Sequence, residues 1–115
     1  MIIKHSKDVK SKKIVEEGVE GVHKQRLLTP EMGAPNFTMR KFTVEEGGFT
    51  FYHDHDFEHE VYILSGKGVA RKQDDEVEIG AGDAILVEPG EIHQFVNRGK
   101  DELIFLCLIP NDAKM

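Results

Sequence analysis

The sequence predicts an all-β fold in which short antiparallel strands close into a barrel or sandwich. Turn-forming Gly, Pro, Asn and Asp residues recur along the chain, mostly at intervals of 8 to 18 residues. The segments between them are rich in β-branched and aromatic residues with a partial two-residue alternation, which is the period of a strand. Helix has little support, because the only candidate, residues 7–17, carries a poor apolar stripe.

Six segments have strand character. In chain order, the first two flank the Gly47-Gly48 pair, and the third follows a cluster of histidines. The fourth follows Gly82, the fifth follows Gly90, and the sixth follows the turn at residues 97–101. Their expected bounds are 37–44, 48–53, 59–64, 83–87, 92–97 and 102–109.

The last of these segments contains an uninterrupted apolar run, Leu103 to Ile109. An extended strand with this sequence is apolar on both faces, whereas a strand with one wet face alternates. One face therefore needs extra cover, from either a second copy of the chain or an N-terminal segment laid across the sheet. We expect a homodimer.

A chain of 115 residues fits one domain. Within it, we expect residues 37–115 to form the barrel. Residues 1–36 are expected to contribute N-terminal strands or an arm that packs on the barrel or across a dimer. The lysines between positions 4 and 13 are interpreted as a solvated face.

The composition is that of an ordinary globular protein, with 39% hydrophobic and 31% charged residues. The net charge of −6, from 15 basic and 21 acidic side chains, makes nucleic acid an unexpected partner. No run reaches the length of a membrane span and no secretory signal is recognisable, so we expect a cytoplasmic protein without a membrane partner. The single cysteine, Cys107, cannot form an internal disulfide.

Four of the six histidines are candidate metal ligands: His53, His55, His59 and His93. On a strand, His53 and His55 project from one face about 7 Å apart, close enough to converge on one ion. A straight strand would carry His59 about 20 Å from His53, so the chain must turn between them at residues 56–58.

His59 then opens the next strand and shares its parity with Val61 and Ile63, so that His59 rather than Glu60 is expected to face inward. His93 shares its parity with Phe95 on a separate strand. A barrel can bring all four imidazoles around one point. Two alternatives stay open at this stage: an acidic, histidine-rich solvated surface, and single buried histidines that are hydrogen-bonded in the core.

The spacing of Gly47, His53, His55, His59 and Gly66 resembles the first motif of the cupin superfamily. The stretch from Gly82-Asp83 to His93 and Asn97 resembles the second cupin motif. The two motifs lie 15 residues apart and together span Gly47 to Asn97. The resemblance implies a single-domain cupin of the jelly-roll type, an antiparallel β-barrel that commonly holds a metal inside.

Two features depart from the family pattern. The family often has Glu as the third ligand, and here the candidate positions hold His59 and Glu60, of which we expect His59 to bind. Pro89 stands one residue later than the motif's proline, which we expect to alter the loop rather than the metal site. The nearest resemblance is to small four-histidine, manganese-type cupins. It implies a divalent transition metal, with Mn as first choice and Fe, Ni, Co, Cu or Zn as alternatives.

Four neutral imidazoles leave two positions open on an octahedral ion, for which an anionic or enolisable oxygen is a suitable ligand. Zinc, which prefers four ligands, would be saturated by the same set. Strand parity nominates four residues for the cavity wall. Arg40 could hold a carboxylate or be exposed, and the Cys107 thiol could face the metal or belong to the core. The nominated residues are Arg40, Phe95, Phe105 and Cys107.

The function expected from this resemblance is that of a metal-dependent oxygenase or dioxygenase acting on a small organic substrate. Two alternatives stand beside it: a non-catalytic cupin that binds or senses a small ligand or metal, and a metal-dependent isomerase. The sequence assigns no catalytic residue. Because one fold carries many functions, the site has to decide among them.

Overall fold

The computed structural model describes residues 1–113 of the chain. Among these residues it has strands and two single-turn 3-10 helices, Ser6–Asp8 and Pro30–Met32, so the expected all-β fold is confirmed. No helix in this part of the chain is long and apolar enough to cross a membrane. The strands are β1 Lys12–Lys13, β2 Glu20–Leu28, β3 Phe37–Phe49, β4 His59–Ser65, β5 Lys67–Arg71, β6 Glu76–Gly80, β7 Ala84–Val87, β8 Gln94–Asn97 and β9 Leu103–Pro110.

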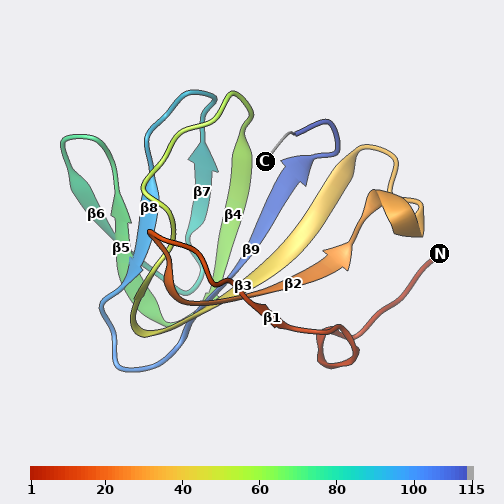
Figure 1. Cartoon of the computed structure of the whole chain (residues 1–115), viewed down its shortest axis with the longest axis horizontal. Helices are drawn as coiled ribbons and strands as arrows, with labels where there is room; N and C mark the ends of the chain where they lie inside the picture. The colour runs from red at the N-terminus through yellow and green to blue at the C-terminus, as the bar shows by residue number, and fades with distance from the viewer. Residues whose placement is uncertain (114–115) are drawn as a thin grey trace.

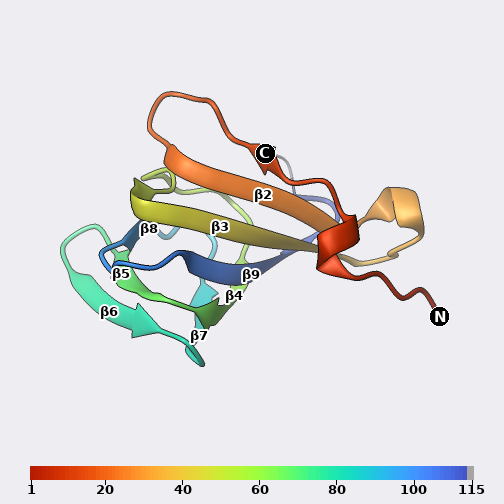
Figure 2. The same cartoon turned by 90° about the horizontal axis from the view of Figure 1, so that it is seen from below.

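The strands form one antiparallel sheet in the order β6-β5-β8-β3-β9-β4-β7. The strand β2 pairs with β3 as well, and β1 pairs with β2. Figure 1 shows the strands fanned from β6 to β2, and the turned view in Figure 2 shows the same sheet curled, with β2 and β3 side by side above β9 and β4. Non-consecutive neighbours of this kind are typical of the jelly roll.

The long strand β3 connects the two halves of the curled sheet. It pairs with β9 from Phe37 to Val44, and its last residue, Phe49, pairs with Val96 of β8. The expected second strand at 48–53 is wrong, because β3 continues through the glycine pair to Phe49 and residues 50–58 form a loop with an isolated bridge at His53. A glycine pair is typical of a turn, but here the pairing of β2 with β3 continues past it through a register shift.

The sequence predicted neither β5 nor β6, and it placed N-terminal strands or an arm within residues 1–36 without giving bounds for β2. These strands alternate weakly because charged residues occupy much of their length, as in Glu20–Leu28 and Glu76–Gly80. Their pairing with neighbouring strands, rather than their own pattern, places them in the sheet.

The core lies on the inner face of β3, β4 and β9, where Val44, Ile63, Leu103 and Phe105 are fully buried. Cross-strand register places Phe42 beside Phe105, with ring centroids 5.4 Å apart, and Phe105 beside Ile63. The apolar run in β9 alternates between buried and half-buried residues. Its inner half therefore belongs to the core, while the outer half lies on the opposite face of the sheet.

The N-terminal segment lies against the inner face rather than against the outer face of β9. The backbone N–H of Ile14 donates to the carbonyl of Val22 at 2.9 Å, and the side chains of Ile14 and Val19 pack against the core. As a result, residues 12–19 border the interior of the curled sheet.

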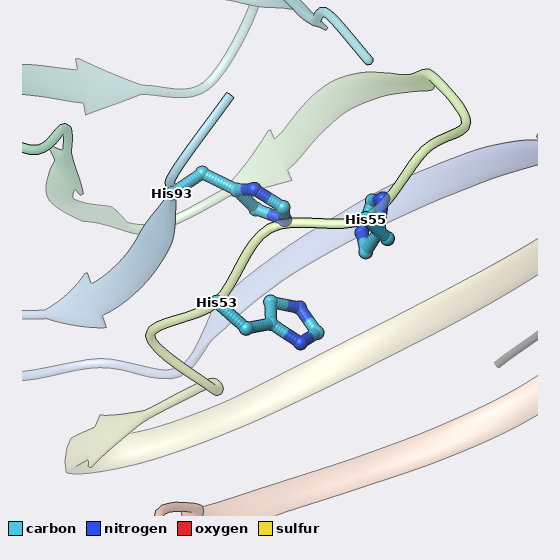
Figure 3. A group of neighbouring side chains, drawn as sticks. All are labelled: His53, His55 and His93. Carbon is cyan, nitrogen blue, oxygen red and sulfur yellow. The ribbon is translucent and has the colours of Figure 1, made fainter. Parts of the chain in front are cut away.

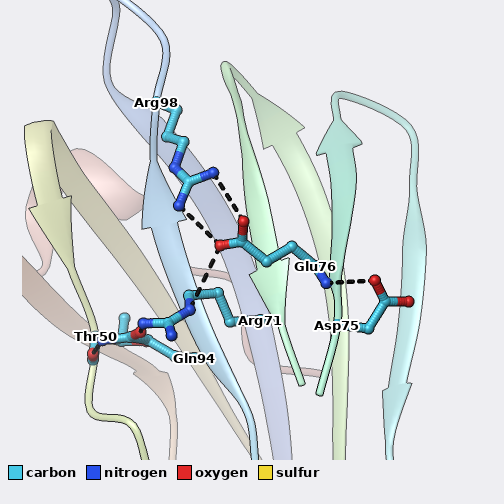
Figure 4. Close-up of polar contacts among 6 residues, drawn as sticks. All are labelled: Thr50, Arg71, Asp75, Glu76, Gln94 and Arg98. Carbon is cyan, nitrogen blue, oxygen red and sulfur yellow. Dashed lines mark hydrogen bonds and ion pairs between the residues drawn. The ribbon is translucent and has the colours of Figure 1, made fainter. Parts of the chain in front are cut away.

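A polar network fixes the end of the sheet that carries His93. Figure 4 shows Arg98 and Arg71 beside the carboxylate of Glu76. Arg98 pairs with Glu76 at 2.8 Å, and Arg71 also donates to the amide oxygen of Gln94 at 2.9 Å. The Gln94 amide donates in turn to the carbonyl of Thr50 at 2.9 Å. These bonds connect β5, β6 and β8 to the loop after β3, and so hold that loop beside β8.

Candidate metal centre

The first pair of candidate ligands is set by a backbone bridge. The N–H of His53 donates to the carbonyl of His93 at 3.2 Å, and the N–H of His93 donates back at 3.0 Å. Directly opposed residues of an antiparallel bridge present their side chains on the same face. Thr50 also binds Phe95, one residue out of register with this bridge: the Thr50 N–H donates to the Phe95 carbonyl at 3.0 Å, and the Thr50 hydroxyl accepts from the Phe95 N–H at 2.9 Å.

His55 is held by the turn that precedes β8. The N–H of Gly90 donates to the His55 carbonyl at 2.7 Å, and Gly90 adopts a φ of +79° that a residue with a side chain rarely adopts. Gly90, three residues before His93, therefore connects the loop carrying His55 with the segment carrying His93.

The three side chains converge, as Figure 3 shows. One ring nitrogen from each of His53, His55 and His93 lies within 4.8 Å of the others. The ring centroids of His55 lie 5.0 Å from His53 and 4.9 Å from His93. These three histidines could hold a divalent metal ion.

Hydrogen bonds fix which nitrogen each ring presents. Nδ1 of His55 lies 3.0 Å from the carbonyl oxygen of Phe57, and Nδ1 of His93 lies 2.9 Å from that of Glu91. Because a carbonyl oxygen only accepts, each Nδ1 carries the proton and donates it. In the neutral rings Nε2 is then unprotonated, and its lone pair can bind a metal.

His59 joins the group from β4. It is 6% exposed and lies on the inner face with Val61 and Ile63, as the parity argument predicted. Its Nε2 lies 2.6 Å from Nε2 of His55, although His59 is outside the set of three whose nitrogens all lie within 4.8 Å. Two lone pairs at this separation repel each other, so a proton or a cation must lie between them. This donor set fits a divalent metal ion.

The other side of His59 contacts a sulfur. Its Nδ1 lies 3.0 Å from Sγ of Cys107, and Nη2 of Arg40 donates to the same sulfur at 3.0 Å. Cys107 is 2% exposed and Arg40 is 3% exposed. The side chain of Cys107 thus lies between a buried guanidinium and a candidate ligand, and Arg40 is buried rather than solvated.

The environment favours the neutral form of three of these histidines, His53, His59 and His93. Burial, reinforced by the nearby His93 and His55, lowers the pKa of His53 to about 4, and burial with His55 and Arg40 lowers that of His59 to about 3. Burial also lowers the pKa of His93. For Cys107, burial raises the pKa, and the charge of Arg40 opposes that rise. Neutral imidazoles are ready to bind a metal without first losing protons.

The histidines open onto a cavity of about 850 Å³. Its size falls in the range of small-molecule sites. The four candidate histidines and all four residues nominated for its wall, Arg40, Phe95, Phe105 and Cys107, line it. Glu60 does not, because it is exposed on the opposite face of β4.

Sequence reasoning missed several lining residues. Phe57 is buried within the histidine loop and stacks on His55 at 4.0 Å, and its parity with His53, His55 and His59 was the available signal. Lys12 and Lys24 also line the cavity. Lys12 is exposed, as expected for a solvated face, and it also borders the cavity because β1 pairs with β2.

A curled antiparallel sheet that encloses a histidine cluster defines a small β-barrel with a candidate metal centre, and comparisons with known proteins identify the family. Residues 40–109 match the Cupin domain family. Over 90 residues the chain is 41% identical to the oxalate-binding protein of Thermotoga maritima, covering 78% of this chain and 67% of that protein. The chain belongs to the cupin family.

Solved structures agree with this assignment. The polyketide cyclase RemF from Streptomyces resistomycificus superposes with a TM-score of 0.91 at 32% identity, covering 97% of this chain and 80% of RemF. A protein from Thermotoga maritima described as a predicted oxalate decarboxylase superposes with a TM-score of 0.84 at 30% identity, covering 95% and 98% of the two chains.

Proposed function

We propose that this cupin binds a divalent metal through His53, His55, His59 and His93 and uses the ion to hold a small organic acid. The observation that carries the proposal is the orientation of the rings. The Nδ1 atoms of His55 and His93 are each bound to a carbonyl, which leaves Nε2 directed to the shared region. Manganese is our first choice among the metals, with Fe, Ni, Co, Cu and Zn as alternatives.

The surroundings of the histidines favour an anionic ligand. Arg40 lies behind His59 and lines the same cavity, and a guanidinium pairs well with carboxylates. A bound divalent ion adds positive charge that four neutral imidazoles do not compensate, and would supply Lewis acidity toward a ligand oxygen. The relative named for oxalate binding supports a carboxylate as the ligand class.

Elemental analysis of protein purified without added metal tests the first half of this proposal. Calorimetric titration with oxalate, before and after removal of the metal by a chelator, tests the second. We expect oxalate to bind the metal-loaded protein and not the chelated one, and His53→Ala to abolish both metal retention and oxalate binding. Oxalate binding that survives chelation would contradict the proposal. Val77→Ala, at an exposed position on β6, is the control that should retain both.

We keep the dioxygenase as a second candidate because the cavity is far larger than a small dicarboxylate needs and is walled by aromatic rings, including Phe42, Phe95 and Phe105. Four nitrogen ligands leave two positions on a six-coordinate ion, enough for an organic oxygen and dioxygen together. Oxygen consumption by the metal-loaded protein, measured with aromatic acids and with the His53→Ala control, would distinguish turnover from binding.

We further propose that two copies associate through the outer face of β4, β7 and β9, in the cytoplasm. Tyr62, Leu64 and Leu86 are exposed there, beside the outer half of the apolar β9 run. Such a face is typical of an interface. Sedimentation should show a dimer that Leu86→Glu dissociates, whereas Val77→Glu, at an exposed position on β6, should leave it intact. A monomeric wild-type protein would contradict this proposal.

A further inference from the structure

Besides the histidines, the cavity is lined by a group of cationic side chains, which we call the cationic wall. Lys24 of β2 and Arg40 of β3 line the cavity, and Lys12 of β1 lies at its exposed rim. The pairing of β1 with β2 sets Lys12 opposite Lys24. The pairing of β2 with β3 sets Lys24 opposite Phe42, which lies two residues after Arg40 on the same face of β3. Three cationic side chains therefore gather on one side of the site.

Cationic neighbours surround Lys24, although two acidic residues, Glu16 and Asp54, also line the cavity. Burial lowers the pKa of Lys24, and the nearby charges of Arg40, Arg26 and Lys12 lower it further, while Glu16 acts weakly in the opposite sense. Within residues 1–113, no carboxylate lies within 4.0 Å of the Lys24 ammonium. Like charges that are partly buried together repel each other, and a bound anion would relieve this repulsion.

Aromatic rings connect the histidine wall with the cationic wall. The ring centroids of His93 and Phe95 are 6.2 Å apart, those of Phe95 and Phe105 are 5.2 Å apart, and those of Phe105 and Phe42 are 5.4 Å apart. The Arg40 guanidinium lies 5.0 Å from the Phe42 centroid. These rings all line the cavity, so the surface between the two polar ends is suited to an apolar, planar body.

We propose that Lys24 and Arg40, with Lys12 at the rim, form an anion subsite for the far end of the ligand. The ligand class is an organic acid with two anionic groups separated by an aromatic ring: one group lies at the histidines and the other at the cationic wall. This inference rests on the proposed function, because the near group is held by the metal. Oxalate has no ring between its two carboxylates, so we expect it to occupy only the metal end.

Two probes separate the subsite from the metal centre. Benzoate carries a ring with one carboxylate, and terephthalate carries a second carboxylate across the ring. We expect the manganese-loaded protein to bind terephthalate about tenfold more tightly than benzoate in calorimetric titrations, since a charge-assisted contact contributes at least that factor. The preference should weaken as the salt concentration rises.

Lys24→Gln is the test variant, and Lys41→Gln is the matched control because it removes the same charge from the outer face of β3. We expect Lys24→Gln to lose most of the preference for terephthalate while its affinity for benzoate is unchanged, and Lys24→Arg to retain the preference. The control should behave as wild type. Thermal unfolding of each variant confirms that it is folded.

The outcomes distinguish the two levels of the argument. Failure of both acids to bind the metal-loaded protein, or binding that persists after chelation, overturns the proposed function and the subsite with it. Metal-dependent binding of benzoate as tightly as terephthalate overturns only the subsite. Equal losses in Lys24→Gln and Lys41→Gln would overturn it too, because they would show an effect of net charge rather than of a local contact.

Discussion

Cys107 offers a sharp test of how the histidines are oriented. Its sulfur lies 3.0 Å from Nδ1 of His59 and 3.0 Å from Nη2 of Arg40. When His59 presents Nε2 to a metal, Nδ1 carries the proton and donates it to this sulfur. Cys107→Val keeps a buried apolar side chain of similar size and removes the acceptor. The tautomer and orientation of His59 would then no longer be fixed by a hydrogen bond.

The size of the effect follows from the two hydrogen bonds that the sulfur accepts. Removing an outer partner of a ligating histidine typically lowers metal affinity by about 10- to 100-fold. That range corresponds to about 1.4 to 2.8 kcal/mol. The variant also removes an acceptor from the buried Arg40 guanidinium, which costs about 1 to 3 kcal/mol of folding stability. We therefore expect weaker metal binding together with a lower unfolding midpoint.

Manganese titration against a competing chelator measures the affinity, and nitrogen NMR of the imidazoles reports the tautomer of His59. Cys107→Ser, which keeps an acceptor at the same place, should retain most of the affinity and the Nδ1–H tautomer. Wild-type affinity in a folded Cys107→Val variant would refute the reasoning. So would equal losses of affinity in the Val and Ser variants, because they would show that packing rather than the hydrogen bond matters.

Three further predictions concern stability. In metal-free protein the folded-state pKa values of His53 (about 4) and His59 (about 3) lie below the usual 6.5, so the unfolded chain binds more protons. Stability is therefore full above about pH 6.5 and falls as the pH is lowered toward 4; urea unfolding midpoints at several pH values should show this, with a shallower slope in His59→Gln. Phe105→Ala should cost about 3 to 5 kcal/mol in urea unfolding because Phe105 is fully buried, and a loss below 1 kcal/mol would contradict its place in the core. Gly90→Ala should cost about 1 to 2 kcal/mol from its positive φ alone, since the added Cβ meets nothing within 4 Å, and a neutral result would contradict that backbone geometry.

The strands that the sequence predicted well, such as β4 and β9, are rich in apolar residues. Within residues 59–64 burial alternates strictly: the structure buries His59, Val61 and Ile63 and exposes the residues between them. The strands that it missed, β5 and β6, and the strand for which it gave no bounds, β2, carry charge along much of their length, so their hydrophobic pattern is weak. Such strands are held by pairing with neighbours distant in the sequence.

The spacing of His53 and His55 predicted correctly that their side chains converge, although the strand assumed in that argument is absent. The expected strand at 48–53 is absent, and residues 50–58 form a loop, yet His53 and His55 still converge. Their convergence depends on the bridge to His93 and on the bond from Gly90 to the His55 carbonyl, both of which come from the second motif. The spacing therefore identified the residues that converge, but contacts with the second motif, rather than a local strand, bring them together.

The sequence by itself determined the all-β class, the inward face of each alternating strand and the candidate ligands, because these depend on patterns over a few neighbouring residues. Tertiary structure alone decided which groups surround those ligands. The register of β3 against β9 places Arg40 beside Cys107, and the pairing of β2 with β3 brings Lys24 to the same cavity. These residues are separated by up to 83 positions in the chain, and no local periodicity encodes contacts at that range.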